Sequence, residues 1–268
     1  MVDESKTDPD AAAGTTPAAG SSQVGSRHRR AKMDDVDLAG VDLSRSEFTR
    51  TSMTGADLAG ARLAGAQLVH VDLRGANLAG AFLQRATLSN VDLDGADLTG
   101  ADMRGAILQG VKLSRARAAG LILTGATLES VEAEEAALDG ACFDGAELQA
   151  VTFQAASLTG ASFQGTHGAQ CAFEAGELTD CDLGGATFEN AVFKGIALRR
   201  CALAGTLFRR TTFKDLVLED CEVAGCMLQQ CIGPGPALEK VLADGGARLA
   251  PPVAVKVWRA LRRTPDGD

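Results

Sequence analysis

The sequence is poor in the large residues that fill an ordinary globular core. It has no tyrosine, one tryptophan and only 4% aromatic residues among 268, whereas glycine occurs 31 times. A packed domain of this length normally uses more large side chains in its interior. The composition therefore disfavours a conventional globule and favours a repeat architecture.

Two kinds of segment are also missing. No apolar run reaches the roughly 18 residues of a membrane-spanning helix, and the first residues, MVDESKTDPD, lack the basic and apolar regions of a secretory signal. Cysteine occurs seven times, an odd number that favours a reducing compartment. A net charge of −9 opposes non-specific nucleic-acid binding by the whole molecule. We therefore expect a cytoplasmic protein with no membrane association and no direct nucleic-acid partner.

A five-residue repeat runs through most of the chain without a change of phase. From Leu38 to Leu228, a large apolar residue occupies 36 of the 39 central positions spaced five residues apart; the exceptions are Ala118, Ala133 and Gly168. The position two residues before each centre is Ala or Val in 25 of the 39 units. Neither the helical period nor strand alternation gives a strict five, whereas a solenoid with one short turn per unit does. We expect the coil to loosen at the three small centres.

The units Ala56-Asp57-Leu58, Ala76-Asn77-Leu78 and Ala96-Asp97-Leu98 resemble the A(D/N)LxX unit of the pentapeptide-repeat family, and the resemblance covers about 195 residues. It implies an all-β fold, a right-handed quadrilateral β-helix in which four units make one coil of about 20 residues. About ten such coils fit in residues 33–232.

The distribution of charge supports this coil length. Nine of the 15 basic residues in residues 34–232 have an acidic residue 20 positions away, as in Asp97 with Arg117 and Glu174 with Lys194. Opposite charges that stack on adjacent strands stabilise a sheet. Phenylalanines recur at the same interval, which predicts columns of rings such as Phe153, Phe173 and Phe193 in the core.

The two ends lack the repeat. Residues 1–32 are rich in small and polar residues and are expected to be a disordered tail, whose basic run Arg27–Lys32 is either an interaction segment or a solvated linker. Residues 233–268 are expected to form a C-terminal α-helical cap over the open end of the solenoid. In gyrase-protecting relatives this end forms the dimer interface, so the resemblance implies a homodimer; a monomeric cap is the alternative. The candidate cap and dimer residues are Leu207, Met227, Leu238, Val241, Leu242, Val257, Trp258 and Leu261.

No catalytic motif is present. There are three histidines, and the glycines follow the repeat rather than a phosphate-binding pattern. His167 and Cys171 are close in sequence, but Cys171 falls at an interior position and His167 at a surface position over Glu147. Six cysteines share the interior phase, and their spacing does not match the short spacing of zinc ligands. We predict a protein that is not an enzyme and that binds no metal or cofactor.

Acidic residues dominate the surface of the repeat. Residues 34–232 hold 27 acidic and 15 basic residues, and the segment from Ala118 to Phe193 holds 12 acidic residues and no lysine or arginine. Among those that have no lysine or arginine 20 residues away, five are the candidate interaction residues: Glu129, Glu134, Asp139, Asp144 and Glu177. Surface charge that serves solubility is the simpler interpretation.

The function hypotheses follow from this surface. The resemblance includes members that mimic DNA and shield DNA gyrase from inhibitors, which implies a protein partner such as a type II topoisomerase and a role in antibiotic resistance. The alternative is a structural or adaptor scaffold, for example a secretion-system accessory protein. Phe82 and Ile122, at outward positions on one face two coils apart, are its candidate contacts.

Overall fold

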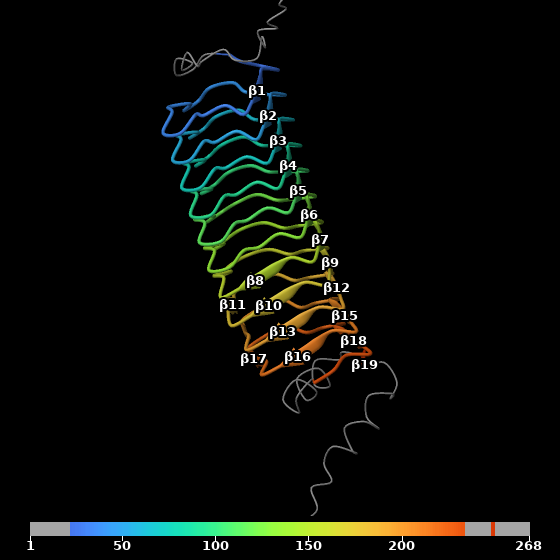
Figure 1. The fold of residues 1–268 in the computed structure, drawn as a ribbon. Coiled ribbons are helices and arrows are strands. Elements are labelled where there is room, and N and C mark those ends of the chain that lie inside the picture. Colours follow the sequence, from blue (N-terminus) through green and yellow to red (C-terminus); the bar gives the residue numbers. More distant parts are fainter. Residues whose placement is uncertain (1–21, 234–247, 250–268) are drawn as a thin grey trace, which may run out of the picture.

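The protein is a straight parallel β-solenoid of about ten turns (Figure 1). This computed structural model describes residues 22–233 and 248–249. Strand partners within residues 22–233 lie 20 residues apart, as in Glu47 with Gln67 and Asp57 with Asn77. The coil length predicted from the sequence is therefore confirmed, and each side chain lies directly over the one a coil earlier.

Each coil has four faces. In the coil of residues 46–65, face A is residues 46–50, face B is 51–55, face C is 56–60 and face D is 61–65, and the same faces recur every 20 residues. Face A carries the longest sheet, seen along the right of Figure 1. Its parallel strands are β1 (Arg27–Arg29), β2 (Glu47–Thr49), β3 (Gln67–Val69), β4 (Thr87–Ser89), β5 (Ile107–Gln109), β6 (Thr127–Glu129), β7 (Glu147–Gln149), β9 (His167–Ala169), β12 (Thr187–Glu189), β15 (Leu207–Arg209) and β18 (Met227–Gln229), followed by β19 (Arg248–Leu249).

Faces B and C form regular strands only in the C-terminal half. Isolated bridges hold face D, as between Arg62, Phe82 and Asp102, and also the earlier coils of faces B and C. The strands of face B are β8 (Thr152–Gln154), β10 (Ala172–Glu174), β13 (Val192–Lys194) and β16 (Thr212–Lys214). Those of face C are β11 (Glu177–Thr179), β14 (Ala197–Arg199) and β17 (Val217–Glu219).

The polar residue of the repeat closes the turn that follows it. Asp57 Oδ1 accepts the backbone N–H of Ala59 at 3.0 Å, and Asn77 Oδ1 accepts that of Ala79 at 3.1 Å. The corner residue then adopts a left-handed conformation, with φ of 61° at Gly60 and 62° at Gly80. Glycine avoids the cost of about 1–2 kcal/mol that other residues meet there. These two requirements explain why the unit contains Asp or Asn before the leucine and often glycine after it.

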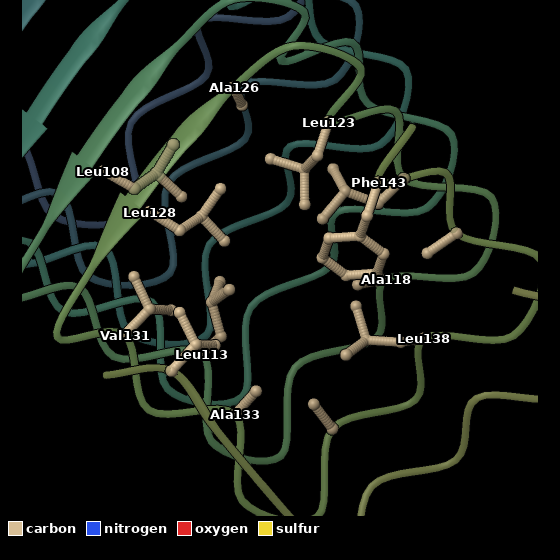
Figure 2. Close-up of a cluster of buried hydrophobic side chains, with 14 of the residues drawn as sticks. Leu108, Leu113, Ala118, Leu123, Ala126, Leu128, Val131, Ala133, Leu138 and Phe143 are labelled. Carbon is tan, nitrogen blue, oxygen red and sulfur yellow. The ribbon is translucent and has the colours of Figure 1, made fainter. Parts of the chain in front are cut away.

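The interior is filled by the central residues of each unit, which point inward from all four sides (Figure 2). Leucine dominates the first coils, and phenylalanine becomes frequent later. The predicted columns are confirmed: the ring centroids of Phe153 and Phe173 are 4.8 Å apart, and those of Phe173 and Phe193 are 4.7 Å apart. Rings of neighbouring columns meet edge to face, as Phe143 does with Phe153 at 5.8 Å.

The expected loosening at the small central residues is wrong. Ala118 and Ala133 are fully buried, and their N–H groups donate normal ladder hydrogen bonds of 2.7 and 2.9 Å. At Gly168, the ring of Phe188 in the next coil occupies the vacant space, so that a Cβ atom on Gly168 would lie 2.6 Å from its Cδ1 atom. A larger neighbour thus compensates for the small centre at Gly168, and the ladder continues unbroken at all three positions.

The expected boundary of the N-terminal tail is also wrong, because the solenoid already includes residues 22–32. β1 pairs with β2, and Lys32 bridges to Ser52. His28 takes a central position and stacks on Phe48, with ring centroids 4.8 Å apart and planes 9° apart. An imidazole ring thus replaces the expected leucine, which hides the repeat from a search for aliphatic residues. Residues 1–21 lie outside the described part.

The C-terminal cap lies almost wholly outside the described residues. This applies to Leu238, Val241, Leu242, Val257, Trp258 and Leu261. Arg248 and Leu249 are described, and they form β19, which pairs in parallel with β18. Leu207 and Met227 are adjacent in register, as predicted, and both are partly exposed.

Burial lowers the pKa of His28 below its ordinary value of 6.5. The folded state therefore binds the proton less readily than the unfolded state. The contribution of neutral His28 to folding stability is complete above pH 6.5 and declines as the pH falls below that value. We expect the amides of β1 to exchange faster at pH 5 than at pH 7.5, after correction for intrinsic rates. In a His28→Leu variant this extra opening should disappear; if the variant opens to the same degree, His28 is not the cause.

Candidate interaction surface

The acidic surplus lies on two adjacent faces. Within residues 34–232, faces B and C together hold 18 acidic and 8 basic residues, whereas faces A and D hold 9 and 7. The acidic residues of face B are Asp34, Asp35, Asp72, Asp92, Asp94, Glu132, Glu134, Glu135, Glu174 and Asp215, and those of face C are Asp37, Asp57, Asp97, Asp139, Glu177, Asp180, Glu219 and Asp220. The rod is thus acidic mainly along one side.

The five acidic residues selected from the sequence do not form one patch. Glu129 lies on face A, Glu134 on face B, Asp139 on face C and Asp144 on face D, because successive units of a coil turn through all four faces. Glu177 also lies on face C, two coils after Asp139, but it occupies a different position within its five-residue unit. The five candidates are therefore spread around the rod, and only some of them can face any one partner.

Two of these residues close turns in the following coil. Asp139 Oδ1 accepts the N–H of Thr159 at 2.9 Å and the hydroxyl of Ser157 at 2.5 Å. Asp144 makes the same pair of contacts, to the N–H of Gln164 at 3.0 Å and to the hydroxyl of Ser162. Each carboxylate replaces the Asp or Asn that the next coil lacks at its serine.

This arrangement has a sequence signal that the five-residue pattern missed. An aspartate stands 18 residues before a serine in all three cases, Asp34 with Ser52, Asp139 with Ser157 and Asp144 with Ser162. Asp34 likewise accepts the N–H of Thr54 at 3.1 Å. A comparison of opposite charges alone therefore misidentifies such carboxylates as surface charges without a partner.

The other three candidates differ in their partners. Glu177 forms an ion pair with Arg199, which also contacts Glu219 at 2.7 Å, so the absence of a basic partner predicted for Glu177 is wrong. Arginine is long enough to reach a carboxylate 22 residues earlier. Glu129 accepts a hydrogen bond of 3.1 Å from Gln109 Nε2. Within residues 22–233, Glu134 has no hydrogen bond or ion pair through its side chain.

The stacked charge pairs are confirmed only in part. Direct contacts join Arg117 to Asp97 at 3.4 Å and Lys194 to Glu174 at 3.1 Å, and Arg200 contacts Asp180 at 2.7 Å. Elsewhere the partner differs from the predicted one. Arg74 contacts Asp72 of its own coil at 2.6 Å. Exposed pairs of this kind contribute at most about 1 kcal/mol each, so they indicate register more than stability.

The thiol groups of Cys171 and Cys226 are placed for packing rather than for reaction. Cys171 is buried, and its Sγ lies 3.6 Å from the carbonyl oxygen of Leu148. Burial raises the pKa of Cys171 to about 11 and that of Cys226 to about 12. His167 lies on the surface beside Glu147, as predicted. The described residues contain no group of three or more potential ligands placed to hold a metal ion, and no helix long and apolar enough to cross a membrane.

These features define a class of protein, the parallel β-solenoids built from five-residue units. The pentapeptide-repeat model, described as "Pentapeptide repeats", matches eight copies at residues 31–68, 66–105, 106–145, 146–185 and 177–215. The chain belongs to the pentapeptide-repeat family. A comparison with curated protein sequences finds no match.

Solved structures of the same family are similar. HetL from Nostoc sp. strain PCC 7120, involved in the regulation of heterocyst differentiation, is 25% identical, with a TM-score of 0.52 over 81% of this chain and 93% of HetL. Rfr23 from Cyanothece 51142 is 27% identical, with a TM-score of 0.36 over 45% of this chain and 90% of Rfr23. The plasmid-mediated fluoroquinolone resistance protein QnrB1 is 15% identical, with a TM-score of 0.33 over 90% of this chain and 97% of QnrB1.

The turn-closing role of Asp139 predicts that its loss costs more stability than the loss of Glu134, whose side chain makes no such contact. Asp139→Ala should cost about 0.5–1.5 kcal/mol, because it removes two hydrogen bonds, whereas Glu134→Ala should change stability by less than about 0.5 kcal/mol. Thermal melting followed by circular dichroism measures both. Equal losses in the two variants would contradict the assignment of Asp139 to the turn.

Proposed function

We propose that this protein is a non-enzymatic binding protein that presents its acidic faces B and C to the basic DNA-binding groove of a protein partner. The observation that carries the proposal is the concentration of 18 acidic against 8 basic residues on these two faces. The specific candidate is a type II topoisomerase such as DNA gyrase, with protection against gyrase-directed antibiotics as the biological role and the cytoplasm as its location.

The magnitude of the charge is compatible with such mimicry. Ten coils at about 4.8 Å each give a rod of about 48 Å, over which a DNA duplex carries about 28 phosphate charges, roughly half of them on one side. Faces B and C carry a net charge of −10, the difference between 18 and 8. One side of the rod therefore approaches the charge that one side of a duplex offers to a groove. The description of HetL as involved in the regulation of heterocyst differentiation is compatible with a binding role for this fold.

A supercoiling assay tests the proposal. Micromolar wild-type protein should inhibit DNA gyrase or relieve a gyrase poison, and a face B variant with Glu132→Lys, Glu134→Lys and Glu135→Lys should lose at least tenfold in potency, because opposed charges become like charges. The matched control carries Glu129→Lys, Glu147→Lys and Glu222→Lys on faces A and D, with the same change in net charge. Equal loss in the control would assign the effect to net charge alone. Absence of any wild-type effect would overturn the topoisomerase assignment.

A homodimer through the C-terminal end is part of this proposal. Leu207 and Met227 form a partly exposed apolar pair on face A near that end, which supports an interface there. The double variant Leu207→Glu, Met227→Glu should sediment as a monomer under conditions in which the wild-type protein sediments as a dimer. A wild-type protein that sediments as a monomer at tens of micromolar would refute the dimer.

The adaptor function is the second candidate, and it rests on a different surface. Phe82 on face D is 45% exposed, whereas Ile122, two coils later on the same column, is partly buried. An exposed aromatic ring on a flat face is a common anchor for a protein partner.

A further inference from the structure

Within residues 22–233, the basic residues that form no ion pair are concentrated on faces A and D of the first coils. Of the 19 lysines and arginines in residues 22–233, ten form an ion pair and nine do not. Six of those nine lie on faces A and D of the first coils: Arg29, Arg30, Arg45, Arg50, Arg62 and Arg85. In residues 22–105 these two faces hold eight arginines and three acidic residues, Asp42, Glu47 and Asp102. An acidic protein thus carries a positive region on the side away from faces B and C.

The exposed ring of Phe82 lies within this region. Phe82 follows Arg62 in the column and precedes Asp102, one coil away on each side. Arg85 occupies the corner of the same unit. Arg104 lies in the next coil and forms an ion pair with Asp102, the residue that follows Phe82 in the column.

Asp102 fixes the position of Arg104. The Asp102 residue is only 7% exposed, and its carboxylate accepts Arg104 Nε at 2.9 Å, Arg104 Nη2 at 2.5 Å and Gln84 Nε2 at 2.7 Å. Hydrogen bonds from Arg104 lower the pKa of Asp102, which stays charged. The guanidinium of Arg104 is therefore held in place before any ligand arrives, which reduces the entropy lost on binding.

Two other arginines lie beside glycines of the following coil. Cγ of Arg45 lies 3.7 Å from the position of a Cβ atom on Gly65, and Cγ of Arg85 lies at the same distance from that on Gly105. The aliphatic part of each arginine side chain thus passes the glycine at the corner of the next coil. Arg45 and Arg85 are two coils apart, about 9.6 Å, and so are Phe82 and Ile122.

We propose that the surface formed by Arg45, Arg62, Phe82, Arg85, Arg104 and Ile122, here called the face D patch, binds an extended acidic segment of a protein partner with apolar side chains between its carboxylates. Arginine pairs with carboxylates in a bidentate manner, and Phe82 with Ile122 provides apolar contacts. A polyproline II segment repeats one side about every 9.3 Å, close to the two-coil spacing of the patch.

A nucleic acid fits the face D patch less well. Phe82 offers one aromatic ring, so only one base can stack, and Ile122 offers none. A polyanion that continues beyond the patch meets a protein of net charge −9. The face D patch shares no residue with faces B and C, so this proposal and the topoisomerase proposal can fail independently. The patch also specifies the kind of partner that the adaptor function would bind.

Fluorescence polarisation tests the face D patch on the full chain. The probe is a labelled peptide with leucine at every third position and glutamate elsewhere; its control replaces each glutamate by glutamine. The acidic peptide should bind, with affinity that falls as salt rises, and the control peptide should not. Phe82→Ala and the double variant Arg62→Ala, Arg85→Ala should each weaken binding about tenfold or more, whereas Lys214→Ala, an unpaired lysine on face B, should leave it unchanged.

Three outcomes would overturn the proposal. They are the absence of saturable binding at millimolar peptide, equal affinity in all variants, and tighter binding of a labelled oligothymidylate that the same variants abolish. The last would identify a nucleic-acid site instead. All substituted side chains are exposed, and circular dichroism spectra that match the wild type establish that each variant is folded.

Discussion

The structure depends on one constraint, the in-register stacking of each residue on the residue 20 positions earlier. Parallel backbone hydrogen bonds fix this stacking, and the left-handed corners together with the side-chain-capped turns make it possible within five residues. Because the register does not change, a side chain's neighbours along the rod are set by position alone. Core columns, charge pairs and surface faces all follow from it.

Much of the fold could be predicted because this constraint is visible in the sequence. The repeat gave the coil length, the columns of Phe153 and Phe173 and the interior position of Cys171, all of which depend only on phase. The start of the solenoid could not be predicted in this way, because His28 fills a core position with an aromatic ring that is usually polar. The regular packing at Gly168 could not be predicted either, because it depends on the rotamer of Phe188.

The surface was less predictable, because phase gives a side chain's face but not its partner. Asp139 and Asp144 close turns in the next coil, and Arg199 reaches past its nearest neighbour to Glu177. Such contacts depend on side-chain length and on which hydrogen-bonding groups a neighbouring coil lacks. Once these contacts are assigned, the charges separate into an acidic side on faces B and C and a basic, partly aromatic region around Phe82.

The unbroken register makes length and angular position separate properties of the rod. Loss or duplication of 20 residues removes or adds one whole coil and leaves every remaining side chain on its original face. Loss of a single five-residue unit instead moves everything after it by one face, so that the column of Phe82 would continue into residues that now belong to face A. Changes in whole coils therefore alter the reach of each surface without altering its chemistry, whereas changes in single units would join surfaces that the present chain keeps apart.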